Sequence, residues 1–188
     1  MKILILNQAF HPDIVATAQQ ATDLARELAL RGHEVTVLAG RHAYGRGSAS
    51  YPRSEKWEGI RILRVSALQL GKRSRLARAA NFGSFLVTCT LRMMRLRRFD
   101  VVVAMTSPPL IGVLAALFTR FKGGALVQWV MDLNPDEAIA AGWLRKDAAI
   151  THLLEGMFRW SILRSRTIIV LDRFMKERIE ARIEQSAL

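Results

Sequence analysis

Apolar and polar positions along the chain follow two different periods, which predict strands and helices in turn. The first forty residues contain a short apolar run at 3–6, a polar segment at 7–16, a stretch with apolar residues at every third or fourth position up to Arg31, and a second apolar run at 35–38. The two runs have the length and composition of buried strands, and the stretch between them has the period of an amphipathic helix. We therefore expect a strand-helix-strand unit at the start of the chain.

The predicted helix has sequence signals at both ends. Thr17 and Gln20 have the spacing of a capping box, in which two side chains bond to backbone N–H groups at the start of a helix. Gly32 follows the last periodic residue and tolerates the positive φ with which many helices end. In units of this kind ligands bind beyond the carboxyl end of the first strand, so functional residues are expected first within 7–17.

The alternation continues through the rest of the chain. Short apolar, β-branched runs predict further strands, and a helical pattern with a proline near its first turn follows at 110–120; the strands are expected at 60–65, 101–105, 125–130 and 167–171. Parallel neighbours need a crossover that usually contains a helix. The predicted fold class is therefore α/β, with a Rossmann-like parallel sheet and helices on both faces. With 188 residues, 51% of them hydrophobic, and no linker rich in Pro, Gly or Ser, one domain is expected.

Three features concern the membrane and the cellular compartment. Residues 99–118 form a long apolar stretch, but Asp100 and the pair Pro108-Pro109 would make a transmembrane helix costly there. The single Cys89 excludes an internal disulfide and a cysteine-cluster zinc site, and is expected to be packed and inert. The chain runs into its first strand without the features of a signal peptide, which predicts a cytoplasmic location.

The positive charge is concentrated in one third of the chain. The formal net charge is +12, and residues 41–98 account for all of it, with fourteen Lys or Arg against Glu55 and Glu58, while the remaining residues carry fourteen of each sign. This third contains an apolar run flanked by basic residues, which predicts an amphipathic helix. The residues expected to face a membrane are Lys72, Arg73, Arg75, Arg78, Phe82 and Phe85.

Two interpretations of this basic segment stay open. An anionic membrane surface attracts each basic residue near the headgroups by about 1 kcal/mol, which predicts peripheral attachment at the inner face of the plasma membrane. A solvated basic face, with its last arginines placed favourably at a helix C-terminus, explains the same pattern without a partner. Nucleic acid is not an expected partner, because aromatic residues hardly alternate with these arginines and no nucleic-acid-binding motif is present.

Several catalytic signatures are missing from the sequence. No glycine-rich dinucleotide motif follows the first strand, and neither a P-loop nor an Asp-x-Asp sequence occurs. The four histidines have no ligand spacing between them, so neither a metal nor another cofactor is expected.

Polar residues at the carboxyl ends of predicted strands remain as the candidate site. Asp132 follows the strand at 125–130, where a carboxylate can accept a proton from a bound hydroxyl or orient it, or can cap the next helical turn instead. Asp136 and Glu137 fit the start of that helix. Candidates follow two other strands as well, and for these the geometry of the loops is the alternative explanation: His11, Asp13, Thr106 and Ser107.

Four parts of the sequence, taken in order, resemble the amino-terminal half of a family 4 glycosyltransferase. They are Phe10-His11-Pro12-Asp13, the segments 24–28 and 31–37, the strand at 100–102 with its sequel Thr106-Ser107-Pro108-Pro109-Leu110, and Asp132-Leu133-Asn134-Pro135. The resemblance spans essentially all 188 residues and is to the bacterial branch that builds surface polysaccharides.

This resemblance implies the GT-B architecture, in which two Rossmann-like domains face each other across a cleft. In the family the amino-terminal domain mainly holds the acceptor, and the carboxyl-terminal domain holds the nucleotide-sugar through two glutamates separated by seven residues. This chain has no glutamate pair at that spacing, and Val15-Ala16 replaces the glycine pair usual in the first loop. The resemblance therefore implies that residues 1–188 are an acceptor-side domain, inactive without the carboxyl-terminal nucleotide-sugar domain.

The implied full enzyme moves a sugar from a nucleotide-sugar donor to a lipid-linked or saccharide acceptor, with retention of configuration, in cell-surface polysaccharide synthesis. Asp132 is the expected catalytic residue, with a positioning or base role. The expected substrate-binding residues are His11, Asp13, Thr17, Thr106, Ser107 and Glu137. Two alternatives remain: a non-catalytic module that binds a membrane or an acidic partner, and one half of a sugar-nucleotide epimerase.

Overall fold

The computed structural model describes residues 1–43, 50–71 and 74–184, and these form an α/β fold around one sheet. Strands and helices alternate along most of the chain, as the sequence pattern predicts. The strands are β1 (Lys2–Leu6), β2 (Glu34–Gly40), β3 (Ser54–Trp57), β4 (Ile60–Val65), β5 (Val101–Ala104), β6 (Ala125–Val130) and β7 (Thr167–Val170). The helices are α1 (Ala16–Leu30), α2 (Arg75–Met94), α3 (Ile111–Lys122), α4 (Asp136–Ala140), α5 (Ala149–Ile162) and α6 (Arg173–Glu184).

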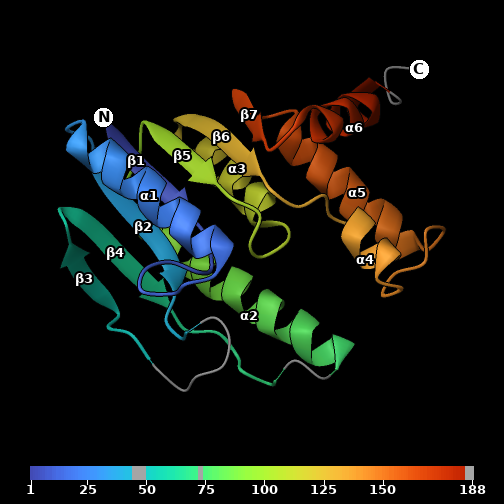
Figure 1. Cartoon of the computed structure of the whole chain (residues 1–188), viewed down its shortest axis with the longest axis horizontal. Coiled ribbons are helices and arrows are strands. Elements are labelled where there is room, and N and C mark those ends of the chain that lie inside the picture. Colours follow the sequence, from blue (N-terminus) through green and yellow to red (C-terminus); the bar gives the residue numbers. More distant parts are fainter. Residues whose placement is uncertain (44–49, 72–73, 185–188) are drawn as a thin grey trace.

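The sheet has the strand order β3-β4-β2-β1-β5-β6-β7 (Figure 1). Every neighbouring pair is parallel except β3 with β4, which is antiparallel. The Rossmann-like parallel sheet expected from the sequence is therefore confirmed. The edge strand β3 was not predicted, because its sequence Ser-Glu-Lys-Trp has only one apolar residue and lacks the β-branched run that marks the other strands.

Helices cover both faces of the sheet. On one face, apolar residues of α1 such as Ala21 and Ala25 pack on alternate residues of β1, β2 and β4. On the other face, α2 and α3 contribute Phe85, Cys89 and Phe118 to a second core cluster. Cys89 is 1% exposed, and its burial raises the pKa of the thiol, so the residue is packed in the core as expected.

One predicted helix signal at the start of α1 is wrong. The residue before the helix is Val15, and no side chain caps the first turn. The N–H groups of Ala18 and Gln19 bond instead to the carbonyl of Val15, at 2.9 and 3.1 Å, so Thr17 lies within the helix rather than capping it. The signal at the other end is confirmed, because Gly32 follows the helix with φ +78°.

The structure changes the orientation expected for α2. Phe85 is fully buried in the core, so the prediction that this residue faces a membrane is wrong. The residues that α2 exposes are also apolar, and they recur at helical spacing along the side away from the sheet: Leu76 at 83%, Val87 at 60%, Leu91 at 54% and Met94 at 67%. We call these four residues the outer stripe of α2. Lys72 and Arg73 lie outside the described residues, and Arg75 is described only as the first residue of the helix.

Among the described residues, no helix combines the length and the hydropathy that a membrane crossing would need. Residues 99–118 instead contain β5, a loop and most of α3, as the sequence pattern predicts.

Candidate functional site

The strand order puts a topological switch point between the carboxyl ends of β1 and β5. The chain adds β2 and β4 on one side of β1, and β5 to β7 on the other, so the direction of winding reverses at this point. Ligands of open α/β sheets bind at such a switch point. The backbone N–H of Gln8 donates to the carbonyl of Ser107 over 2.7 Å, and the N–H of Gly40 donates to the carbonyl of Gln8 over 2.7 Å. The loops after β2, β1 and β5 are thus joined into one rim.

Two carboxyl groups and a hydroxyl meet beside this rim. The Thr106 hydroxyl, after β5, donates a hydrogen bond to Oδ2 of Asp132, after β6, over 3.1 Å. Glu137 stands in the first turn of α4, and its pKa is raised by partial burial, by the charge of Asp132 and a hydrogen bond with it, and by the charge of Asp136. Asp132 therefore has a hydroxyl donor on one side and the carboxyl group of Glu137 on the other. Such a carboxylate is placed to accept a hydrogen bond, or a proton, from a bound hydroxyl.

The structure also shows which of these acidic residues take part in the start of α4. Asp132 does not cap α4, because Pro135 precedes that helix and no side-chain capping bond forms at its start. Asp136 and Glu137 do begin the helix, as expected, and Asp136 also forms an ion pair with Arg182 of α6.

Three polar side chains of the loop after β1 contact other parts of the protein. Asn7 is fully buried, and its Nδ2 donates to the carbonyls of Ala9 at 2.7 Å and Thr17 at 3.2 Å. The His11 ring stacks on Trp57 of β3, with ring centroids 4.0 Å apart. The Tyr51 hydroxyl donates to Asp13 Oδ1 over 3.0 Å, and burial together with this bond raises the pKa of Tyr51. The loop is therefore held toward the β3 edge of the sheet.

A buried arginine that sequence analysis did not single out makes this attachment possible. Arg64 of β4 is 4% exposed and donates to the carbonyls of His11 and Gly40. It also forms an ion pair with Glu55 of β3 at 2.8 Å, and its guanidinium lies 4.5 Å from the Tyr51 ring. The sequence did contain a signal for this residue, because Arg64 lies at an inward position of the apolar run 60–65. An arginine buried there needs several hydrogen-bond and charge partners.

The structure thus brings together some of the expected site residues and separates others. Thr106, Asp132 and Glu137 form one cluster, and Ser107 joins the same rim through Gln8. The His11 ring instead contacts Trp57, and the Asp13 carboxylate accepts a hydrogen bond from Tyr51. Thr17 lies in the first turn of α1 and touches the loop through its carbonyl. Whether each of these residues binds substrate stays a prediction.

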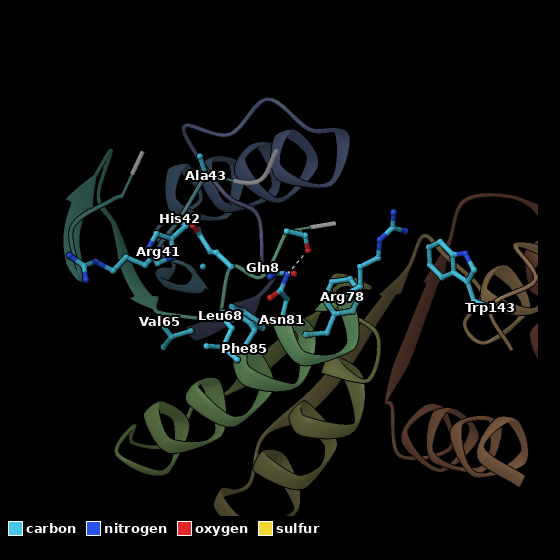
Figure 2. A pocket seen from close by; sticks show the side chains of 15 residues that line it. Gln8, Arg41, His42, Ala43, Val65, Leu68, Arg78, Asn81, Phe85 and Trp143 are labelled. Atoms are coloured by element: carbon cyan, nitrogen blue, oxygen red, sulfur yellow. Dashed lines mark hydrogen bonds between the residues drawn. The ribbon is translucent and has the colours of Figure 1, made fainter. Parts of the chain in front are cut away.

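A cavity of about 570 Å³ lies on the β2 side of the rim (Figure 2). Its wall combines the carboxyl ends of β2 and β4 with the first half of α2, and Gln8 and Trp143 complete it. Arg78 and Phe82, expected from the sequence to face a membrane, are part of this lining. Sequence analysis missed the cavity because five separate segments form it and none of them carries a ligand-binding motif.

Among the residues that the structure describes, no three His, Cys, Asp or Glu side chains are grouped so that they could hold a metal ion.

Comparison with known proteins finds a matching family model and similar folds. Residues 16–185 match the family model described as a glycosyl transferase 4-like domain. No curated protein matches the sequence. Among solved structures, the fold is similar to a sucrose-phosphate synthase from Thermosynechococcus elongatus, with a TM-score of 0.64 and 12% sequence identity. The match covers 99% of this chain and 45% of the synthase, so the chain spans less than half the length of that protein.

Proposed function

Because this chain belongs to the glycosyl transferase 4-like family, we propose that it forms the acceptor-side domain of a retaining glycosyltransferase. The partner domain, outside residues 1–188, holds the nucleotide-sugar. The structural match to less than half of a larger synthase supports a two-domain arrangement of this kind. The acceptor is a lipid-linked or free saccharide used in cell-surface polysaccharide synthesis.

The observation that carries this proposal is the hydrogen bond between Thr106 and Asp132 at the carboxyl edge of the sheet. The acceptor hydroxyl lies against Asp132 and passes its proton to that carboxylate as its oxygen bonds to the anomeric carbon of the donor sugar. The nucleoside diphosphate leaves with the electron pair of the bond that breaks. Holding the hydroxyl and the anomeric carbon together is a large part of such catalysis, and closure of the second domain supplies it.

Asp132→Asn in the two-domain enzyme tests this role. The amide keeps the size of the side chain but accepts a proton poorly, so sugar transfer is expected to fall by about 10²-fold. Asp147→Asn, an exposed acid outside the cluster, is the matched control and is expected to keep the wild-type rate. An unchanged rate in Asp132→Asn would remove Asp132 from the reaction.

We also propose that the enzyme is peripheral, attached to an anionic membrane at the inner face of the plasma membrane. Two observations support this. No acidic residue occurs between Glu58 and Asp100, a stretch that contains all of α2. The outer stripe of α2 exposes four large apolar side chains on this positively charged helix. An apolar stripe among basic residues is what a helix at a bilayer surface requires.

A further inference from the structure

We propose that Arg182, near the end of α6, is a positioning residue for sugar transfer, because its ion pair with Asp136 holds the turn that carries Asp132. This inference rests on the proposed function, since it concerns the base of that reaction. Arg182 belongs to a helix far along the chain from this turn, and the ion pair links the two directly. A side chain in this place acts on the reaction through its neighbours, without touching the substrate.

The turn between β6 and α4 has few restraints of its own. Within the part of the chain that the structure describes, α4 is five residues long, has no capping side chain at its start and contains no buried residue. A backbone bond of 3.2 Å from the N–H of Glu137 to the carbonyl of Leu133 closes the turn. A helix this short is not stable alone, so contacts with other elements must hold it.

Two contacts with α5 and α6 provide this restraint, one apolar and one charged. Leu133 packs in a core cluster with Ile162 of α5 and Ile179 of α6. Asp136 forms the ion pair with Arg182, and these two side chains are only 29% and 23% exposed. A partly buried pair is screened less than a pair on the open surface, and its hydrogen bond fixes direction as well as distance. The charged contact therefore orients a turn that the apolar contact only anchors.

Arg182 is itself held in place by α5. Its guanidinium lies 5.7 Å from the ring of Phe158. The Nη2 atom of Arg159 donates to the carbonyl of Ile183, the residue after Arg182, over 3.4 Å. These contacts fix the end of α6, so Arg182 loses little further freedom when it pairs with Asp136.

The ion pair also changes the electrostatics of the acidic cluster. Asp132, Asp136 and Glu137 lie within six residues, and among the described residues the ion pair with Arg182 is the one that these three acids make. The charge of Asp136 raises the pKa of Glu137, and a guanidinium beside Asp136 opposes that effect. The other cation at this end of α6 is Arg159 of α5. Loss of Arg182 should therefore make the cluster bind protons more tightly, and loss of the charge of Asp136 should do the opposite.

The pH dependence of kcat in the two-domain enzyme tests the positioning role. Arg182→Gln should lower kcat by roughly 5-fold or more and move the acidic limb of the profile to higher pH, because the base is then harder to deprotonate. Asp136→Asn should also lower kcat, but should move that limb to lower pH. Arg182→Lys keeps the charge and should keep the limb where the wild type has it. A loss of structure alone does not shift the limb in opposite directions.

Arg178→Gln is the matched control, because Arg178 is exposed, lies one turn earlier in α6 and forms no ion pair with another described residue. This variant should keep kcat within about 2-fold of the wild type, with the limb unmoved. Equal effects of Arg178→Gln and Arg182→Gln would overturn the proposal. So would shifts of the same sign in Arg182→Gln and Asp136→Asn, or an unchanged profile in both.

NMR titration of the Glu137 carboxyl group in this chain gives a readout that does not depend on activity. The pKa of Glu137 should be higher in Arg182→Gln than in the wild type, and lower in Asp136→Asn. If Asp132→Asn lowers sugar transfer while neither variant moves this pKa or the pH profile, the proposed function stands and the role of Arg182 falls. If the pKa moves as expected but Asp132→Asn transfers sugar at the normal rate, the ion pair acts on the cluster and the proposed base falls.

Discussion

The imidazole of His11 stacks on the indole of Trp57, with ring centroids 4.0 Å apart and ring planes 15° apart. His11 follows β1 in the middle of the sheet, whereas Trp57 ends the edge strand β3. The contact therefore ties the loop at the switch point to the far side of the sheet. The His-Pro-Asp sequence at 11–13, which is part of the resemblance to the family, therefore makes a structural contact in this chain whether or not it also binds a ligand.

A double-mutant cycle measures this contact. His11→Ala and Trp57→Ala should each lower the free energy of unfolding, and the coupling between the two changes should be about 0.5–1.5 kcal/mol, the range for aromatic pairs. Urea denaturation of the wild type, both single variants and the double variant gives the value. Strictly additive effects would show that the stack contributes nothing to stability.

Because a stacked His11 can still touch a ligand, a separate measurement is needed for binding. The KM of the two-domain enzyme for its acceptor, compared between the wild type and His11→Ala, is that measurement.

Removal of Glu55 should be much more costly than removal of a similar acid nearby. Glu55 pairs with Arg64, whose side chain is fully buried, so Glu55→Ala leaves a buried guanidinium without its counter-charge, at a cost of about 3 kcal/mol in the free energy of unfolding. Glu58 pairs with Arg26, which is half exposed, and Glu58→Ala should cost less than about 1 kcal/mol. Chemical denaturation gives the free energy of unfolding of the two variants. An equal loss of stability in both would contradict a structural role for Arg64.

The hydroxyl of Thr106 should raise the rate of sugar transfer, because it donates a hydrogen bond to Asp132. Thr106→Val keeps the shape of the side chain but removes the donor to Asp132, so kcat of the two-domain enzyme should fall by roughly 10-fold or more. Thr106→Ser keeps the hydroxyl and should recover most of the rate. A structural role alone would lower the melting temperature of Thr106→Val without changing kcat, and that result would count against a link to Asp132.

The fold was predictable where local pattern and tertiary packing agree. Gly32 ends α1 with φ +78° as its position indicated, and the β-branched runs at 60–65 and 125–130 are strands with those bounds. Prediction failed where packing overrides the local pattern. Thr17 and Gln20 had the spacing of a capping box, but α1 begins at Ala16 with Val15 before it, so the cap position lies two residues earlier than that spacing indicates.

The site was predictable only in part, for a physical reason. Parallel strands end at one edge, so the expectation that residues after β5 and β6 meet there led to Thr106 and Asp132. The face that α2 buries could not be chosen from its sequence, because both of its faces are apolar: Phe85 is in the core, and Leu91 is in the outer stripe. An arginine inside an apolar run, such as Arg64, indicates that it needs partners, but the local sequence does not show that one of them is the carbonyl of His11.

Glu137 should make stability depend on pH. Because the pKa of Glu137 in the folded chain is raised, the fold binds a proton there more tightly than the unfolded chain does. The resulting stability is fully present below the ordinary pKa of a glutamate and is lost as the pH rises through the raised pKa. Glu137→Gln does not titrate, so its melting temperature relative to the wild type should rise between pH 4 and pH 7. The change should be small, because Glu137 is exposed to solvent.

Glu177→Gln, an exposed glutamate of α6, is the control for this measurement. Its melting temperature relative to the wild type should be the same at both pH values. A constant difference for Glu137→Gln as well would show that the pKa of Glu137 is not raised in the folded chain.

The outer stripe of α2 should determine binding to anionic vesicles. We expect the chain to sediment with vesicles of phosphatidylcholine and phosphatidylglycerol but not with phosphatidylcholine alone, and to be released as added salt screens the attraction. Leu91→Asp places a negative charge in the stripe and should weaken binding by roughly 10-fold, since it removes apolar contact and adds repulsion. Leu30→Asp makes the same change at the end of α1, on the opposite face of the sheet, where the leucine is 82% exposed. That control should bind nearly like the wild type. Equal weakening by both changes would mean that net charge alone attracts the chain, and that α2 does not lie on the bilayer.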